Sequence, residues 1–183
     1  AVLGGVRSLL GPDPEGGIAL LRGAGDGPGY YGVSLSIDVG TELLKRKQVA
    51  AARIWLEHAL RRDPWNSEAA IALAEAFHQL EGGTAAVGIL QSAIERNPDN
   101  PLLWENIASH YCLLGNWDLA TKCFRKSEEI APYRYERLLK WAQAMVRLRQ
   151  YSRARRPIQG YLAAMPGDPE GIEIQATIQR HLH

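Results

Sequence analysis

The sequence predicts an all-α fold, a right-handed α-solenoid of about four 34-residue helix-turn-helix repeats followed by a C-terminal capping helix. Prolines recur every 34 residues, at Pro64, Pro98, Pro132 and Pro166. Alanines keep the same step, at Ala52, Ala86, Ala120 and Ala154. A large apolar residue keeps it too, at Leu56, Leu90, Phe124 and Ile158. A small residue lets two helices approach closely, a large one fills the space beside it, and proline ends the helix.

The period divides residues 33–168 into four repeats, at 33–66, 67–100, 101–134 and 135–168. One helical pair cannot bury its apolar face alone, so the repeats are expected to stack. Ten of the 18 glycines fall in residues 1–32, which predicts a Gly-rich N-terminal leader or linker. Residues 169–183 open with a proline and then show helical apolar spacing, so we expect a capping helix there.

Two segments conflict with this pattern. Residues 31–40 alternate between apolar and polar or small side chains, which also fits a strand. We favour a helix, because the helix that follows would otherwise lack a partner. Pro157 lies inside the last predicted repeat helix, and an interior proline predicts a bend.

The composition is that of a globular chain, with 46% hydrophobic and 22% charged residues and a net charge of +1. No apolar run is long enough to span a bilayer. The chain begins with Ala1, so we expect a trimmed or processed piece of a longer product, which leaves room for an upstream membrane anchor. Cytoplasmic and periplasmic locations both stay open.

No pattern in the sequence predicts catalysis. The metalloprotease, phosphate-loop, nucleophile-elbow and paired-cysteine motifs are all absent, so we expect no enzyme, no cofactor and no metal site. Cys112 and Cys123 are expected to be free and mostly buried thiols. Trp104 and Trp141 are expected in the core, and Trp65, in a turn, is the tryptophan expected to be exposed.

The third repeat resembles the tetratricopeptide repeat family. It carries most of the family's signature, at Trp104, Ile107, Ala108, Tyr111, Gly115, Ala120, Phe124 and Pro132. The resemblance extends over about three quarters of the chain and is weakest in the opening helix of the first repeat. It implies a helical repeat scaffold that binds protein partners, but it does not identify a particular function.

The resemblance also implies that the first helix of each pair lines a concave face. Helical projection then gives the inward positions of a partner-binding groove: Ile71, Glu75, His78, Leu102, Glu105, Ser109, Leu139, Gln143 and Arg147. These residues suit an amphipathic helix or an extended peptide. The basic and amide side chains with which some family members grip a C-terminal carboxylate are missing at the matching positions. Binding through the edge or the convex side stays open.

Charge is uneven along the array. The second repeat carries a net charge of −4 and the fourth +5. The fourth repeat contains an arginine cluster that is either a solvated helix face or a basic docking edge for an acidic surface: Arg149, Arg153, Arg155 and Arg156. An acidic repeat and a basic one in the same chain also allow self-association.

The leading hypothesis is a non-enzymatic scaffold that helps to assemble a multiprotein complex. The resemblance and the alanine- and arginine-rich style suggest a bacterial envelope, secretion or polysaccharide-export assembly. The alternative is a regulatory or docking domain of a longer enzyme or transporter. Nucleic-acid binding is disfavoured, because polar base-reading side chains do not recur at one position of each repeat.

Overall fold

The computed structural model describes residues 30–132 and 134–182 of the chain. Every regular element within these ranges is an α-helix. The chain divides into two compact units, the first ending at Pro98 and the second beginning at Asp99. The predicted all-α helical repeat fold is therefore confirmed. Residues 1–29 of the predicted leader lie outside the described residues.

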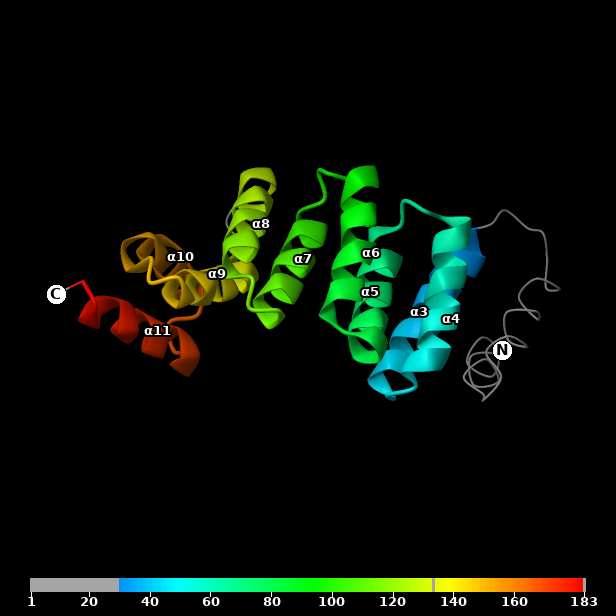
Figure 1. The fold of residues 1–183 in the computed structure, drawn as a ribbon, viewed down its shortest axis with the longest axis horizontal. Helices are drawn as coiled ribbons and strands as arrows, with labels where there is room; N and C mark the ends of the chain where they lie inside the picture. Colours follow the sequence, from blue (N-terminus) through cyan, green and yellow to red (C-terminus); the bar gives the residue numbers. More distant parts are fainter. Residues whose placement is uncertain (1–29, 133, 183) are drawn as a thin grey trace. The chain divides into compact units, whose positions relative to one another are not determined.

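The described residues of unit 1 form four helices, which Figure 1 shows in blue to green. They are α3 (Tyr30–Lys45), α4 (Val49–Arg62), α5 (Ser67–Glu81) and α6 (Gly83–Arg96). Each helix packs on the next, and α3 also contacts α5. The first helices of the two pairs therefore lie in one layer.

The segment with the ambiguous alternation is helical, because α3 runs from Tyr30 through the whole of residues 31–40. Val33, Ile37 and Gly40 are buried at helical spacing. Ser36 is buried as well, although a strand would place it on the polar face. Its hydroxyl donates a 2.7 Å hydrogen bond to the carbonyl of Gly32 and lies 3.0 Å from His58 Nδ1 of α4.

Gly40 is required by the close approach of α3 and α4. A Cβ atom at this position would lie 2.6 Å from Leu56 Cγ, far inside van der Waals contact. Alanine stands at the corresponding position of the following repeats, 34, 68 and 102 residues later, and is buried each time: Ala74, Ala108 and Ala142. The first repeat thus departs from the others toward an even smaller residue.

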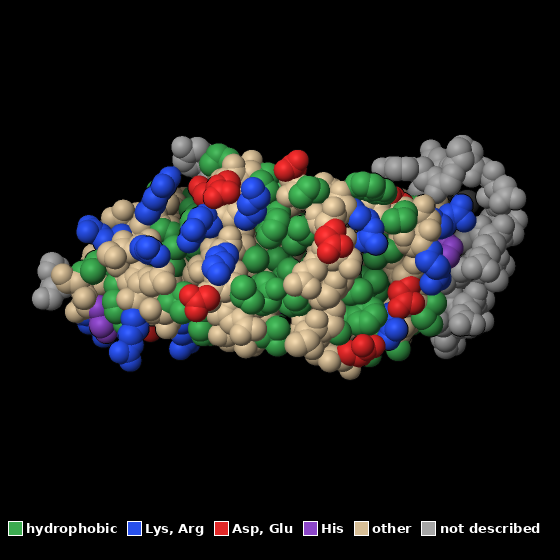
Figure 2. All heavy atoms as spheres, turned by 45° about the horizontal axis from the view of Figure 1, so that its top comes forward, with side chains coloured by type: hydrophobic (Ala, Val, Ile, Leu, Met, Phe, Trp, Pro, Cys, Tyr) green, Lys and Arg blue, Asp and Glu red, His purple; other side chains and the backbone are tan. Residues whose placement is uncertain are grey.

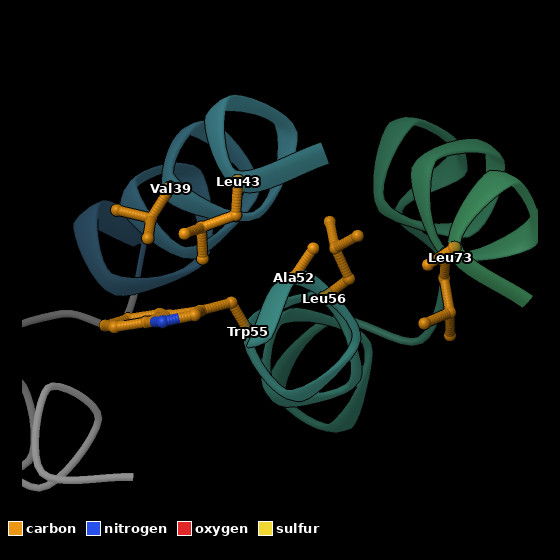
Figure 3. Packing of buried hydrophobic residues seen from close by; sticks show 7 residues of the cluster. Val39, Leu43, Ala52, Trp55, Leu56 and Leu73 are labelled. Atoms are coloured by element: carbon orange, nitrogen blue, oxygen red, sulfur yellow. The ribbon is translucent and has the colours of Figure 1, made fainter. Parts of the chain in front are cut away.

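The core of unit 1 lies between α3, α4 and α5. Trp55 of α4 extends toward Val39 and Leu43 of α3, and Leu56 and Leu73 complete the cluster (Figure 3). The Trp55 side chain is fully buried, and its indole Nε1 has no hydrogen-bond partner among the described residues. The tryptophan therefore contributes to this core through apolar packing.

In the described part of unit 2 there are five helices. They are α7 (Pro101–Leu113), α8 (Trp117–Ile130), α9 (Tyr135–Arg147), α10 (Tyr151–Ala164) and α11 (Pro169–Arg180). Consecutive helices pack on each other, and α9 also contacts both α7 and α11. Helix α10 continues through Pro157, whose ring is buried. Helix α11 occupies the segment predicted to cap the repeats.

The alanines and the large apolar residues of the 34-residue period are buried in both units, whereas the four prolines are exposed. The four alanines are fully buried, and the large apolar residues that follow them are at most 1% exposed. Trp65 is 65% exposed, as predicted. The prediction for Trp104 and Trp141 is only partly met, because both remain half-buried at the boundary of the core.

The loops between repeats follow local capping chemistry. Asn66, Asn100 and Asp168 each accept a hydrogen bond on the side chain from a backbone N–H in the first turn of the next helix. In α7 and α11, proline follows as the first helical residue, where its missing N–H is harmless. Arg134 occupies the corresponding position before α9 and makes no side-chain cap.

The turns within the helix pairs contain the described residues with positive φ. Gly82 and Gly115 fill this role after α5 and α7, with φ of 94° and 74°. Lys47 and Arg149 fill it after α3 and α9, with φ of 62° and 56°. Side chains other than glycine disfavour this left-handed conformation. Lys47, Gly115 and Arg149 occupy the same position of their repeats, so the positive φ is kept there even where the sequence lacks glycine, whereas Gly82 lies one position later and has an extended ψ of 176°.

Candidate functional site

A hollow of about 680 Å³ lies on the face of unit 2 formed by the first helix of each pair and by α11. Because α9 contacts both α7 and α11, it lies between them in this layer. The hollow is lined by Ser109, Cys112, Leu113, Trp117, Lys140, Gln143, Val146, Arg147, Glu170, Glu173, Ile174 and Thr177. Its volume lies within the usual range of small-ligand pockets in proteins.

Helical periodicity explains how these residues converge. Lys140, Gln143 and Arg147 are three and four positions apart on α9, so they share one face of that helix. On α11, Glu170, Ile174 and Thr177 have the same spacing. The last turn of α7 completes the hollow, together with the first residue of α8. Residues of four helices, α7, α8, α9 and α11, thus supply one surface.

The apolar part of the hollow joins the core to an exposed corner. Val146 and Ile174 are partly buried against the apolar cluster of unit 2. Leu113, at the end of α7, is 66% exposed, and Trp117 stands beside it in the lining. The guanidinium of Arg147 lies 5.9 Å from the centre of the Trp117 ring, within range of a cation–π contact.

The polar groups of the hollow make few contacts with one another. Lys140 Nζ donates a 3.3 Å hydrogen bond to Ser109 Oγ, and Gln143 donates one to the carboxylate of Glu170. Among the described residues, no ion pair joins the bases of α9 to the acids of α11. Charges of both signs therefore line the hollow without neutralising each other directly.

The thiol of Cys112 in the hollow has a raised pKa. Burial raises the pKa of Cys112 to about 11, although Lys140 acts in the opposite direction. Burial likewise raises the pKa of Cys123 to about 11. Both thiols are free, as predicted, and both are protonated near neutral pH. No group of three or more metal-ligating side chains occurs in the described part of the chain.

The structure brings together three of the predicted groove residues, Ser109, Gln143 and Arg147, in the lining of the hollow. Leu102 is 39% exposed at the start of α7, and Leu139 packs against the apolar cluster. The other three residues of this prediction, Ile71, Glu75 and His78, lie on α5 of unit 1. Ile71 and His78 are half-buried there, and Glu75 accepts a hydrogen bond from Gln79.

Glu105, also predicted for the groove, belongs to a polar network around Arg137. The Arg137 side chain is completely buried and forms ion pairs with Glu105, at 3.0 Å, and with Glu128. It also donates to Ser127 Oγ and to the carbonyl of Ala131. Ser127 Oγ in turn lies 3.0 Å from Glu105 Oε1. One guanidinium thus links α7, α8 and α9.

Sequence reasoning missed the contribution of α11 and of the α7–α8 turn to this surface. Glu170 and Glu173 belong to a segment whose sequence pattern indicates only a cap. The sequence signal for this surface was the pair of adjacent leucines, Leu113 and Leu114, directly before the turn glycine Gly115. In the structure both leucines are exposed at the end of α7.

The predicted basic edge is exposed throughout. Arg149, Arg153, Arg155 and Arg156 are all exposed, and none forms an ion pair among the described residues. Residues 148–167 contain no Asp or Glu. Figure 2 shows Lys and Arg side chains gathered over unit 2, at the left of the view. The surface is chemically suited to an acidic partner.

Comparison with known proteins finds a family resemblance over part of the chain. The family model described as tetratricopeptide repeat matches residues 43–104. Residues 43–104 thus resemble tetratricopeptide repeats, and the helical repeat fold of the described residues agrees with that resemblance. Proteins of this kind are generally interaction modules without catalytic activity. A comparison with curated protein sequences finds no match.

Solved structures agree with the tetratricopeptide repeat fold. The pilF protein of Pseudomonas aeruginosa has 16% identity and a TM-score of 0.71, over 82% of this chain and 73% of that one. A thermophilic TPR protein of Thermus thermophilus has 18% identity and a TM-score of 0.66, over 82% and 81%. YrrB, described as a TPR protein with an unusual peptide-binding site, has 17% identity and a TM-score of 0.64, over 79% and 74%. At these identities the likeness establishes the fold.

No helix in the described ranges combines the length and the apolar character that crossing a membrane requires.

Proposed function

We propose that this chain is a non-catalytic scaffold that binds a segment of a protein partner, an amphipathic helix or an extended peptide, in the hollow of unit 2. The observation that carries the proposal is the apolar surface of Leu113, Trp117 and Val146 within a charged lining. Helix-in-groove recognition uses such a surface, with apolar anchors and polar groups that orient the ligand.

The setting of this scaffold is part of the proposal. We place it in a bacterial assembly of the envelope, secretion or polysaccharide-export type. The bacterial sources of two structural neighbours, Pseudomonas aeruginosa and Thermus thermophilus, support this setting. The peptide-binding site named for YrrB supports the mode of binding. A docking domain within a longer enzyme or transporter would use the same hollow.

Substitution of Leu113 by aspartate tests the hollow. We expect Leu113→Asp to weaken binding of a fluorescein-labelled, leucine-rich helical peptide about tenfold, because an apolar anchor of this size contributes about 1–3 kcal/mol to binding. Fluorescence anisotropy measures the dissociation constant. Leu119→Asp is the matched control, since Leu119 is 42% exposed in the same unit and does not line the hollow. Equal binding by the two variants would contradict the proposal.

We propose a second surface, the basic edge formed by Arg149, Arg153, Arg155 and Arg156, as a docking site for an acidic protein surface. The absence of acids from residues 148–167 favours it, since no charge of the same segment opposes the arginines. Because all four are exposed, their contribution to binding is expected to weaken with salt.

Charge reversal tests this edge. We expect Arg153→Glu/Arg156→Glu to elute from immobilised polyglutamate at a clearly lower salt concentration than the original protein, with an unchanged melting temperature. The control is Arg61→Glu/Arg62→Glu on α4, which makes the same charge change at exposed residues of unit 1. If both double variants elute at the same salt concentration, only net charge matters and the edge is not a site.

A further inference from the structure

The hollow of unit 2 separates its charges by helix. Its bases, Lys140 and Arg147, come from α9, and its acids, Glu170 and Glu173, come from α11. All four residues are exposed. Although α9 and α11 are in contact, none of these bases pairs with these acids. The two helices therefore offer opposite charges to anything that enters the hollow.

Three of these charged side chains, Lys140, Glu170 and Arg147, contact neutral groups in the hollow. Lys140 is bound to a hydroxyl, Glu170 to the amide of Gln143, and Arg147 lies over the ring of Trp117. None of these contacts neutralises the charge, so each group can still pair with a charged ligand. The third wall, from the end of α7, carries no charged residue in the lining and exposes Leu113.

We propose that the hollow selects an amphipathic helix of mixed charge. Its acidic side chains face α9, its basic side chains face α11, and its apolar side chains cover Leu113 and Trp117. This inference rests on the proposed function and specifies the partner further. Charge complementarity is the argument, since a uniformly acidic or basic helix would meet like charge on one wall, and like-charge contacts at an interface oppose binding.

Three synthetic helical peptides of the same length test the inference. They share one leucine stripe and differ in their flanks, with Glu on one side and Lys on the other, Glu on both, or Lys on both. We expect the original protein to bind the mixed-charge peptide about fivefold more tightly than either of the others, in keeping with the modest strength of exposed ion pairs. Fluorescence anisotropy at two salt concentrations measures the preference, which should shrink at the higher salt.

Two charge-reversed proteins make the test specific. Lys140→Glu/Arg147→Glu is expected to prefer the peptide with Lys on both flanks. Glu170→Lys/Glu173→Lys is expected to prefer the peptide with Glu on both flanks. A gain of affinity for a different peptide cannot result from unfolding, and all four positions are exposed. Circular dichroism of each variant confirms that its helices remain.

The outcomes separate the inference from the proposed function. If every protein binds the three peptides equally, and Leu113→Asp weakens them all, the groove function holds and the charge selection is wrong. If no peptide binds, both are wrong. If sedimentation instead shows that the original protein self-associates through this face, and the reversed variants do not, a second copy is the occupant and the inference is overturned.

Discussion

Replacement of Arg137 by leucine is expected to lower the free energy of unfolding of unit 2 by about 3 kcal/mol. The change removes a buried cation and deprives the carboxylates of Glu105 and Glu128 of their shared partner. Water can replace that partner only in part, because the two side chains are only 13% and 21% exposed. Loss of one member of a buried ion pair costs about 3–5 kcal/mol, and the partial exposure of the carboxylates places the effect at the lower end. Urea denaturation followed by circular dichroism measures it.

Two further variants identify the cause. Arg134→Leu removes a base whose side chain is 35% exposed and whose guanidinium lies 3.5 Å from Glu105, so we expect a loss below about 1 kcal/mol. Adding Glu105→Gln and Glu128→Gln to Arg137→Leu should restore part of the stability, since the carboxylates would no longer be charged. Equal losses for Arg134→Leu and Arg137→Leu would show that burial of the network is not decisive.

Replacement of Trp55 by alanine is expected to destabilise unit 1 by about 3–5 kcal/mol, the usual range for removing a large aromatic side chain from a core. Trp55 is fully buried against Val39 and Leu43, and these neighbours cannot collapse into the whole space. Thermal and urea unfolding of the variant measure the loss. The loss of unfolding free energy should exceed that caused by a substitution at an exposed residue of the same unit.

Trp55→Phe and Trp65→Ala are the controls for this substitution. Phenylalanine keeps an aromatic ring, and no hydrogen bond to Nε1 is lost among the described residues, so a loss of about 1 kcal/mol is expected. Trp65 is 65% exposed, and its removal should change the stability by about 0.5 kcal/mol at most. A large effect of Trp65→Ala would mean that this turn packs more tightly than its exposure indicates.

The repeat architecture could be predicted because its signal is local and periodic. Ala120 and Phe124 mark one helix–helix contact, and the same pair of residue types returns every 34 residues. The ambiguity at residues 31–40 ended in favour of the helix because Ser36 and Gly40 face α4, where the hydroxyl meets His58 and the missing Cβ admits Leu56. Those two reasons are tertiary, so the alternation alone could not supply them.

The candidate site was less predictable, because its residues are brought together by contacts between positions that are far apart in the sequence. Glu105 has the inward spacing of a groove residue, but its carboxylate meets Arg137, 32 positions away. An arginine in a charged helix is ordinarily a surface residue, so its complete burial has no local signal. Glu170 and Glu173 likewise reach the hollow only because α11 packs beside α9.

Lys47 and Arg149 hold the left-handed turn conformation that Gly115 holds at the same position of the α7–α8 pair. A side chain in that conformation raises the energy of the folded turn by about 1 kcal/mol relative to glycine. Local opening releases this strain, so the α3–α4 and α9–α10 turns open at a lower free energy than they would with glycine. Backbone amides at these two turns are therefore where hydrogen exchange should begin, before the packed helices beside them exchange.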